Sequence, residues 1–344
     1  MIIYWLIKRF RRWREARRAQ QPPEPRQPVR RPSRQHAATP VDRDAAISVR
    51  GLRKAYADFE AVRGIDFDVR RGEIVAFLGP NGAGKTTTVE ILEGFRTRSD
   101  GDVLVLGADP ASGNPGWRER IGVVLQESEP ETYLTARECL QLYAGYFDRP
   151  RPIEETLALV GLEAKADSTA GTLSGGQRRR LDVALALIGD PELVFLDEPT
   201  TGFDPSARRA AWQVVAGLRE LGKTIFLTTH YMDEAEFLAD RIIVLAGGEI
   251  VAEGTPATLG GRADSAARVN FALPAGVAPG ELPPPFTTAE IVGGIVRAQT
   301  HAPRDDLRAL TTWAATRDID LADIEVRRPT LEDIYLELTG ATAR

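Results

Sequence analysis

The segment Glu73–Val89, with the sequence EIVAFLGPNGAGKTTTV, decides the fold of this chain. Its apolar run Ile74–Leu78 has the length and the β-branched content of a buried strand, and Lys85 with the threonines after it opens a helix. The loop between them matches the pattern G-x-x-x-x-G-K-[ST] completely. A strand, a glycine-rich loop and a helix in this order predict a loop that cradles a polyphosphate.

Each residue type in this loop has a chemical role. The glycines allow backbone amides to approach a phosphate, which a Cβ atom would block. Lys85 is placed to reach the β- and γ-phosphates, and the hydroxyl of Thr86 is placed to ligate Mg²⁺, beside the positive end of the helix. The predicted nucleotide-binding loop consists of Gly79, Pro80, Asn81, Gly82, Ala83, Gly84, Lys85, Thr86 and Thr87.

Length and composition describe an ordinary globular protein. The 344 residues suffice for two domains and a tail, with 43% hydrophobic residues and a net charge of −5. No run approaches the roughly 18 to 20 apolar residues that span a bilayer, so a partner must supply any transport path. The single cysteine, Cys139, excludes a disulfide framework and indicates a reducing compartment.

Residues 1–46 form a basic N-terminal extension. They hold 12 Arg or Lys against four Asp or Glu, which is about +8, so the remainder of the chain carries about −13. Apolar residues recur at helical spacing among the arginines up to Trp13, and Pro and Arg dominate from Gln21 to Pro40. Three interpretations stay open: an unstructured extension, a membrane-surface helix followed by a linker, and, least favoured, nucleic-acid binding.

The middle of the chain adds a second predicted anion site and a pair of carboxylates. The sequence LSGGQ at 173–177 opens a long helix, where Ser174 and two glycines converge on an anion. Leu193–Leu196 reads as a buried strand that ends in Asp197 and Glu198. Carboxylates at the end of such a strand face the ligand crevice, where the first suits a Mg²⁺ contact and the second a general base on water.

The remaining segments predict the domain organisation. Residues 47–254 read as an α/β domain, with a helical insertion at about 127–172 and with Tyr56 on the connection between its first two strands. The strand Thr224–Thr228 delivers His230 to the edge that carries the other polar residues. Residues 255–344 read as a small α+β accessory domain without a catalytic constellation, in which Ile291–Arg297 forms one strand.

Taken together, these motifs resemble the nucleotide-binding domain of ATP-binding cassette (ABC) proteins, a P-loop NTPase fold with a RecA-like core and a helical subdomain. The resemblance rests on GPNGAGKTT at 79–87, Gln126, LSGGQ at 173–177, LVFLDEPT at 193–200, Asp204 and His230. It implies ATP and Mg²⁺ as ligands.

The resemblance also assigns individual roles. It implies that Tyr56 stacks on adenine and that Gln126 is the Q-loop residue, which touches Mg²⁺ and couples to the membrane partner. It implies that Asp197 and Glu198 are the Walker B pair and that His230 is the switch histidine. The implied catalytic residues are Lys85, Gln126, Glu198 and His230, and the implied metal ligands are Thr86, Gln126 and Asp197.

Two further parts of the resemblance concern assembly. It implies that Ser174, Gly175, Gly176 and Gln177 bind the γ-phosphate of the ATP held by the opposite subunit of a homodimer, beside the D-loop residue Asp204. The closing sequence TLEDIYLELTG at 330–340 resembles bacterial drug-resistance exporters of the daunorubicin type. In these the ATPase is peripheral, on the cytoplasmic face of the membrane, and the permease is a separate chain.

Other functions remain as alternatives. The ATPase could serve an importer, or a transporter of ions or lipids, because the cargo is bound by the permease. A non-transport ABC protein acting on nucleic acid usually carries two cassettes, a zinc module or a long coiled-coil insertion, and none is present. A nucleotide sensor without turnover would be expected to lack Glu198 or His230, and both are in place.

Overall fold

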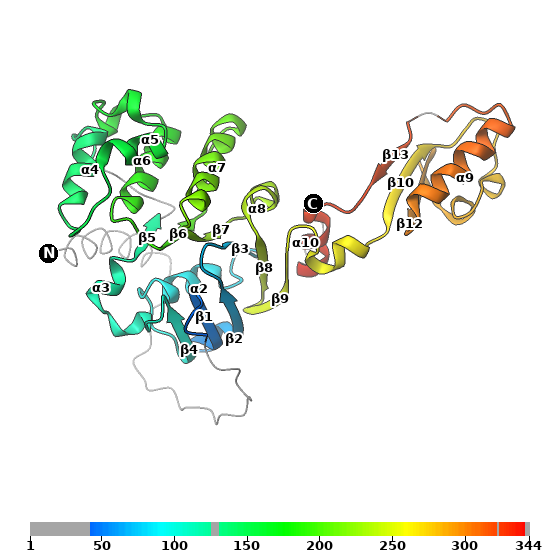
Figure 1. Cartoon of the computed structure of the whole chain (residues 1–344). Helices are drawn as coiled ribbons and strands as arrows, with labels where there is room; N and C mark the ends of the chain where they lie inside the picture. The colour runs from blue at the N-terminus through cyan, green and yellow to red at the C-terminus, as the bar shows by residue number, and fades with distance from the viewer. Residues whose placement is uncertain (1–41, 125–130, 322, 341–344) are drawn as a thin grey trace. The chain divides into compact units, whose positions relative to one another are not determined.

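A computed structural model describes residues 42–124, 131–321 and 323–340 (Figure 1). A boundary between Glu253 and Gly254 divides the chain into two compact units. Most of the predicted basic extension and the predicted Q-loop residue Gln126 lie outside the described residues. Packing begins before Ile47, because Ala45 and Ala46 are already buried. No helix in the described ranges is long and apolar enough to cross a bilayer.

A six-stranded sheet forms the centre of the first unit, in the order β5-β6-β7-β3-β8-β9. Its strands are β3 (Ile74–Leu78), β5 (Ile121–Val124), β6 (Leu193–Asp197), β7 (Thr224–Thr228), β8 (Arg241–Ala246) and β9 (Glu249–Gly254). The pairs β5–β6, β6–β7, β7–β3 and β3–β8 are parallel. All five residues of β3 and of β7 are buried, as is typical of a parallel sheet covered on both faces.

A second sheet of three antiparallel strands has the order β2-β1-β4. Its strands are β1 (Ile47–Tyr56), β2 (Phe59–Val69) and β4 (Asp100–Val105). The prediction that Tyr56 lies on the connection is wrong, because β1 runs through Tyr56 and pairs that residue with Phe59. Ladder hydrogen bonds depend on the backbone, so pairing continues through polar residues such as Arg53 that interrupt the apolar alternation.

Seven helices are described in the first unit. They are α2 (Lys85–Leu92), α3 (Pro115–Arg118), α4 (Ala136–Ala144), α5 (Ile153–Leu159), α6 (Gly175–Leu187), α7 (Pro205–Glu220) and α8 (Met232–Leu238), with short 3-10 helices at Pro110–Ser112, Glu163–Lys165 and Ala170–Thr172. Thr135 followed three residues later by Glu138 is the sequence pattern of a capping box, and the structure has this capping box at the start of α4. Within the described part of 127–172, the only strand-like pairing is an isolated bridge from Thr135 to Thr169.

The core of the first unit joins both sheets through aromatic rings. Phe77 of β3 lies 5.3 Å from Phe226 of β7 and 5.9 Å from Phe67 of β2, measured between ring centroids. Phe195 of β6 meets the ring of Phe226 at 6.0 Å. Phe77, Phe195 and Phe226 are almost fully buried, so this cluster holds the strands that carry the candidate site in fixed positions.

The second unit is an α+β fold around a four-stranded antiparallel sheet, in the order β11-β12-β10-β13. Its elements are a 3-10 helix (Leu259–Asp264), β10 (Ala267–Ala272), short 3-10 helices (Pro279–Glu281 and Phe286–Thr288), β11 (Glu290–Val292), β12 (Ile295–Thr300), α9 (Pro303–Thr316), β13 (Glu325–Arg327) and α10 (Leu331–Thr339). The prediction of one strand over Ile291–Arg297 is wrong. Gly293 and Gly294, with φ of 61° and 79°, turn the chain into a hairpin between β11 and β12.

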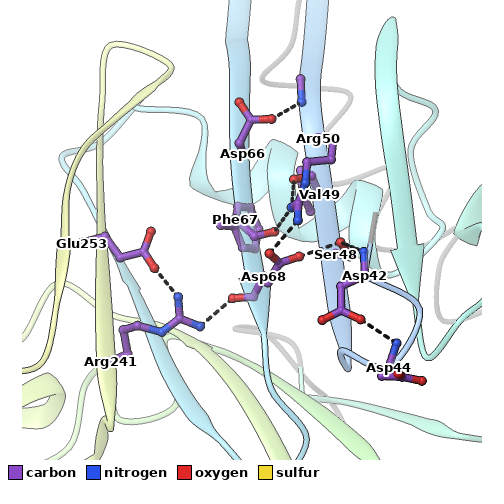
Figure 2. A network of polar contacts seen from close by, with 11 residues as sticks. Asp42, Asp44, Ser48, Val49, Arg50, Asp66, Phe67, Asp68, Arg241 and Glu253 are labelled. Atoms are coloured by element: carbon purple, nitrogen blue, oxygen red, sulfur yellow. Dashed lines mark hydrogen bonds and ion pairs between the residues drawn. The ribbon is translucent and has the colours of Figure 1, made fainter. Parts of the chain in front are cut away.

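A polar network ties the antiparallel sheet to the parallel one (Figure 2). The Arg241 guanidinium at the start of β8 donates to both carboxylate oxygens of Glu73, at 2.8 and 2.9 Å, and to the backbone oxygen of Asp68 on β2. It also pairs with Glu253 (Figure 2). Burial raises the pKa of Glu73, but the hydrogen bonds from Arg241 outweigh it and hold the pKa below its usual value.

We expect Arg241→Met to lower the free energy of unfolding by about 2 kcal/mol, because it leaves the half-buried Glu73 carboxylate without its main partner. Chemical denaturation of the full chain measures the effect. Since the pKa of Glu73 is lowered, the stabilisation exists above its ordinary pKa and disappears as pH falls. The control Arg71→Met removes an exposed ion pair with Glu192 and should change stability far less. Equal losses in both variants would contradict the prediction.

Candidate active site

The glycine-rich loop runs from the end of β3 into α2 and fits closely against its surroundings. A Cβ atom on Gly79 would lie 2.3 Å from the Leu245 backbone oxygen, and one on Gly84 would lie 2.3 Å from that of Ala61. Gly82 and Gly84 have φ of 82° and 103°, a region that side chains rarely adopt. Glycine is therefore required at these positions by backbone geometry and by close packing, as a phosphate-binding loop demands.

Lys85 begins α2 and turns its side chain back over the loop. Its Nζ donates to the backbone oxygens of Gly79 at 2.6 Å and of Pro80 at 3.2 Å, and the residue is 8% exposed. Burial lowers the pKa of Lys85, while the nearby carboxylates of Glu198 and Asp197 act in the opposite direction and favour the ammonium form. The loop cation and the two predicted Walker B carboxylates are thus close enough to interact.

Two neighbouring strands hold these carboxylates. Asp197 ends β6, where its Oδ1 accepts a hydrogen bond of 2.6 Å from the hydroxyl of Thr228 at the end of β7. The backbone amide of Glu198 donates to the Thr228 backbone oxygen at 3.0 Å. Because β6 and β7 are parallel and paired in register from Leu193 to Asp197, their carboxyl ends lie at one edge of the sheet. That edge also carries the loop after β3.

Glu198 and His230 approach each other at this edge. The Nδ1 atom of His230 lies 3.5 Å from Oε1 of Glu198, and the hydroxyl of Thr201 donates to Oε2 at 3.1 Å. The backbone of Glu198 has φ of 47°, which is a strained conformation for a residue other than glycine. The Glu198 side chain is 18% exposed and that of His230 is 44% exposed, so both can reach a ligand or a water molecule.

The predicted signature residues lie elsewhere on the surface of the unit. Ser174 is exposed and forms a capping box with Gln177 at the start of α6, followed by Gly175 and Gly176. No hydrogen bond or ion pair among the described residues joins Ser174 to Lys85 or to His230. Asp204 caps α7 by accepting hydrogen bonds from the amides of Ser206 and Ala207, both at 2.9 Å.

The predicted adenine contact, Tyr56, is half-buried at the end of β1 and has cations beside its ring. Nζ of Lys54 lies 5.0 Å from the ring centroid, and the Arg96 guanidinium carbon lies 5.2 Å from it. Both distances are typical of cation–π contacts. The electron-rich ring therefore already interacts with positive charge. Gln126, predicted to bind Mg²⁺, lies outside the described residues.

Sequence reasoning did not single out Arg179 of α6. This arginine is 9% exposed and donates to the backbone oxygens of Asp197 at 2.9 Å and of Pro199 at 3.1 Å. It thereby fixes the chain on both sides of Glu198. The sequence contains part of the information that would have identified Arg179. A charged residue on the apolar face of a helix indicates a buried partner, but only the fold shows which residue that partner is.

The residues present fit the chemistry of a nucleotide and of Mg²⁺. The loop offers backbone amides, the Lys85 ammonium and the N-terminus of α2, which are donors for phosphate oxygens. The hydroxyl of Thr86 and the carboxylate of Asp197 are the oxygen ligands that Mg²⁺ prefers, together with phosphates. Among the described residues, no group of three or more His, Cys, Asp or Glu could hold a metal ion without such a ligand.

The geometry agrees with the family comparison. Residues 62–201 match the family described as ABC transporter, and residues 267–330 match an ABC transporter-like C-terminal domain. A Nod factor export ATP-binding protein of Rhizobium meliloti is 40% identical over 304 residues, which cover 86% of this chain and 88% of the relative. This chain belongs to the ATP-binding subunits of ABC transporters. It is therefore a nucleotide-binding ATPase with the P-loop fold, as the sequence predicted.

Two drug-resistance proteins are similar to this ABC subunit over most of its length. A doxorubicin resistance ATP-binding protein of Mycobacterium tuberculosis is 38% identical over 312 residues, with 86% of this chain and 94% of the relative covered. A daunorubicin resistance ATP-binding protein of Streptomyces coeruleorubidus is 37% identical over 311 residues, with 88% and 98% covered. The predicted resemblance to the daunorubicin type is confirmed.

Solved ABC cassettes share the fold of the first unit. The dimeric cassette MJ0796 bound to ADP and phosphate is 27% identical, with a TM-score of 0.55, over 61% of this chain and 98% of that one. The protein cbiO1 from Clostridium perfringens, part of the ABC transporter complex cbiONQ, is 29% identical, with a TM-score of 0.58, over 62% and 90%. The fold of the cassette is therefore well established.

Proposed function

We propose that this ABC subunit hydrolyses Mg²⁺–ATP as a homodimer and drives the export of drug-like or lipophilic compounds through a separate membrane permease. The observation that supports it best is the approach of Glu198 and His230, 3.5 Å apart, at the sheet edge that also carries Lys85. A carboxylate, an imidazole and a phosphate-binding cation together are the groups that ATP hydrolysis requires.

Each of these residues takes a defined role in the proposal. Glu198 acts as general base on the attacking water, and His230, within reach of the same carboxylate, contacts the γ-phosphate. Lys85 binds the β- and γ-phosphates. Thr86, Asp197 and Gln126 are the residues that would hold Mg²⁺, which when bound would neutralise negative charge on the phosphate oxygens. Tyr56 contributes an aromatic surface for adenine.

The homodimer explains the signature motif. Ser174 is exposed and caps α6 ahead of two glycines, yet no hydrogen bond among the described residues joins it to Lys85 of its own chain. A second copy that presents Ser174 and Gln177 to the phosphates bound by Lys85 would complete the site, with Asp204 beside the same interface. The dimeric state of the cassette MJ0796, bound to ADP and phosphate, supports this arrangement.

The partner and the cargo follow from the relatives. The names of similar proteins refer to export of Nod factor and to resistance to doxorubicin and daunorubicin, which supports export over import. No helix among the described residues could form a transmembrane path, so we propose a separate permease, contacted through the helical block after Gln126. The subunit would act at the cytoplasmic face of a bacterial membrane.

We expect Glu198→Gln to bind ATP but to hydrolyse it about 10²- to 10⁴-fold more slowly, because the general base is lost. Steady-state phosphate release by the purified full chain measures the rate. Ser174→Arg should also abolish hydrolysis, and a mixture with Lys85→Ala should retain at most one intact site in each heterodimer. Turnover at the wild-type rate by Ser174→Arg alone would rule out the shared site.

We expect co-expression of the chain and its cognate permease in a drug-sensitive bacterium to lower accumulation of an amphipathic compound such as doxorubicin. Lys85→Ala should abolish the effect, because the γ-phosphate loses its cation. Cellular fluorescence of the compound gives the readout, and the permease alone is the control. Raised uptake of a solute that depends on an external binding protein would instead identify an importer.

The basic extension generates a separate prediction about the membrane surface. If residues 1–18 form an interfacial helix, their deletion should weaken binding of the full chain to anionic liposomes and leave ATP hydrolysis intact, since arginines attract anionic lipid headgroups. Raised salt should have the same effect through screening. Co-sedimentation measures binding, and equal binding with and without these residues would favour an unstructured extension.

A further inference from the structure

We propose that Glu234 is a positioning residue that ties the loop after Glu198 to the two helices that follow Asp204 and His230. The inference rests on the proposed roles of Glu198 and His230 in hydrolysis. Glu234 lies on α8, is 0% exposed and belongs to none of the recognised motifs. A carboxyl group in such a place needs hydrogen-bond donors, and the identity of its donors reveals what it does.

One oxygen of Glu234 joins two other segments. Its Oε1 accepts a hydrogen bond of 2.9 Å from the hydroxyl of Thr200 and one of 3.0 Å from the indole Nε1 of Trp212. Both bonds are buried. Thr200 lies two residues after Glu198, and Trp212 lies on α7, the helix that Asp204 caps.

The same three segments carry the proposed catalytic groups. His230 precedes α8, so Glu234 stands four residues beyond it in the chain. Displacement of the Glu234 carboxyl would release Thr200 on one side and Trp212 on the other. The backbone amide of Glu198 already donates to Thr228, two residues before His230. The Glu234 contacts add a second connection, from the loop after Glu198 to the helix after His230, and the distance between the Glu198 carboxylate and the His230 ring depends on both.

Further contacts join α7 to α8. The rings of Trp212 and Phe237 stack at 5.3 Å with an interplanar angle of 26°. Arg208 of α7 pairs with Asp233 at 3.3 Å, and its guanidinium carbon lies 4.0 Å from the centre of the Tyr231 ring. The two helices therefore act as one body, and the Glu234 carboxyl attaches this body to the loop after Glu198.

The geometry favours a neutral carboxyl group at Glu234. Its second oxygen, Oε2, is buried and has no hydrogen-bond partner among the residues that the structure describes. An ionised oxygen without a donor would be costly there. Burial is the main cause that raises the pKa of Glu234, and the charge of Asp233 on the same helix acts in the same direction. The side chains of Thr229, Thr200 and Trp212 lower this pKa but do not outweigh burial. Arg208 of α7 pairs with that aspartate.

The experiment compares variants of the purified full chain in ATP hydrolysis, with kcat and KM for ATP measured separately. Trp212→Phe removes the indole donor but keeps a ring to stack on Phe237. We expect kcat to fall about tenfold, which corresponds to the net contribution of about one hydrogen bond, with KM changed less than about twofold. Glu234→Ala should lower kcat further than Trp212→Phe does. Glu234→Gln should keep kcat close to the wild-type value, because its amide oxygen can accept both hydrogen bonds.

Trp117→Phe is the matched control. Trp117 is 2% exposed, and its Nε1 donates at 2.8 Å to the backbone oxygen of Val105 on β4, which is not one of the three segments. It should lower the melting temperature without changing kcat. A fall in kcat for Trp117→Phe equal to that for Trp212→Phe, or wild-type kcat for Glu234→Ala, would overturn the proposal. Glu198→Gln, measured in parallel, tests the proposed function itself: if it keeps the wild-type rate, that assignment fails first.

A second readout follows from the raised pKa of Glu234. Between its ordinary pKa and the raised one, the folded protein binds more protons than the unfolded protein, so wild-type stability falls as pH rises. Glu234→Gln removes this loss. The melting temperature of Glu234→Gln minus that of the wild type should therefore increase from pH 5 to pH 8. A difference that stays constant or decreases would contradict a neutral carboxyl group.

Discussion

The parallel pairing of β3, β7 and β6 is the constraint on which the rest of the molecule depends. These strands come from distant parts of the chain, yet their carboxyl ends form one edge because the register aligns Phe77 and Asp197 with Thr228. The loop with Lys85, the two carboxylates and His230 all follow from this edge. If one of these strands shifted by one residue against its neighbours, its side chains would turn to the opposite face of the sheet and these groups would separate.

Burial of polar groups around that edge gives the site its rigidity. Arg179, Lys85 and Glu234 are each at least nine-tenths buried, and each has hydrogen-bond partners in other segments of the chain. Such groups are costly unless they find partners, so each one fixes the elements that supply those partners. The strained backbone of Glu198, with φ of 47°, persists because Thr228 and Arg179 hold the chain on either side of it.

The positions of Lys85, Glu198 and Ser174 indicate which parts of the proposed site a single chain supplies. Lys85 and Glu198 share one edge, whereas Ser174 lies apart from Lys85 and offers its helix terminus outward. In the proposed homodimer a second copy would complete the site, and the proposed permease would select the cargo. The second unit has its own core around Phe271, Phe286 and Trp313, which is consistent with an accessory role independent of the chemistry.

The sequence alone determined the nature of the segments that carry the proposed catalytic groups. Local patterns identified the phosphate loop, the capping box at Thr135 and the strands that end in polar residues, because turns, caps and buried strands depend on neighbouring residues. Tertiary structure alone decided the length of β1, the hairpin at Gly293 and the partners of Arg179 and Glu234. These depend on residues far apart in the chain, whose contacts form only when the sheet brings them together, and no local pattern records which donor will meet a buried acceptor.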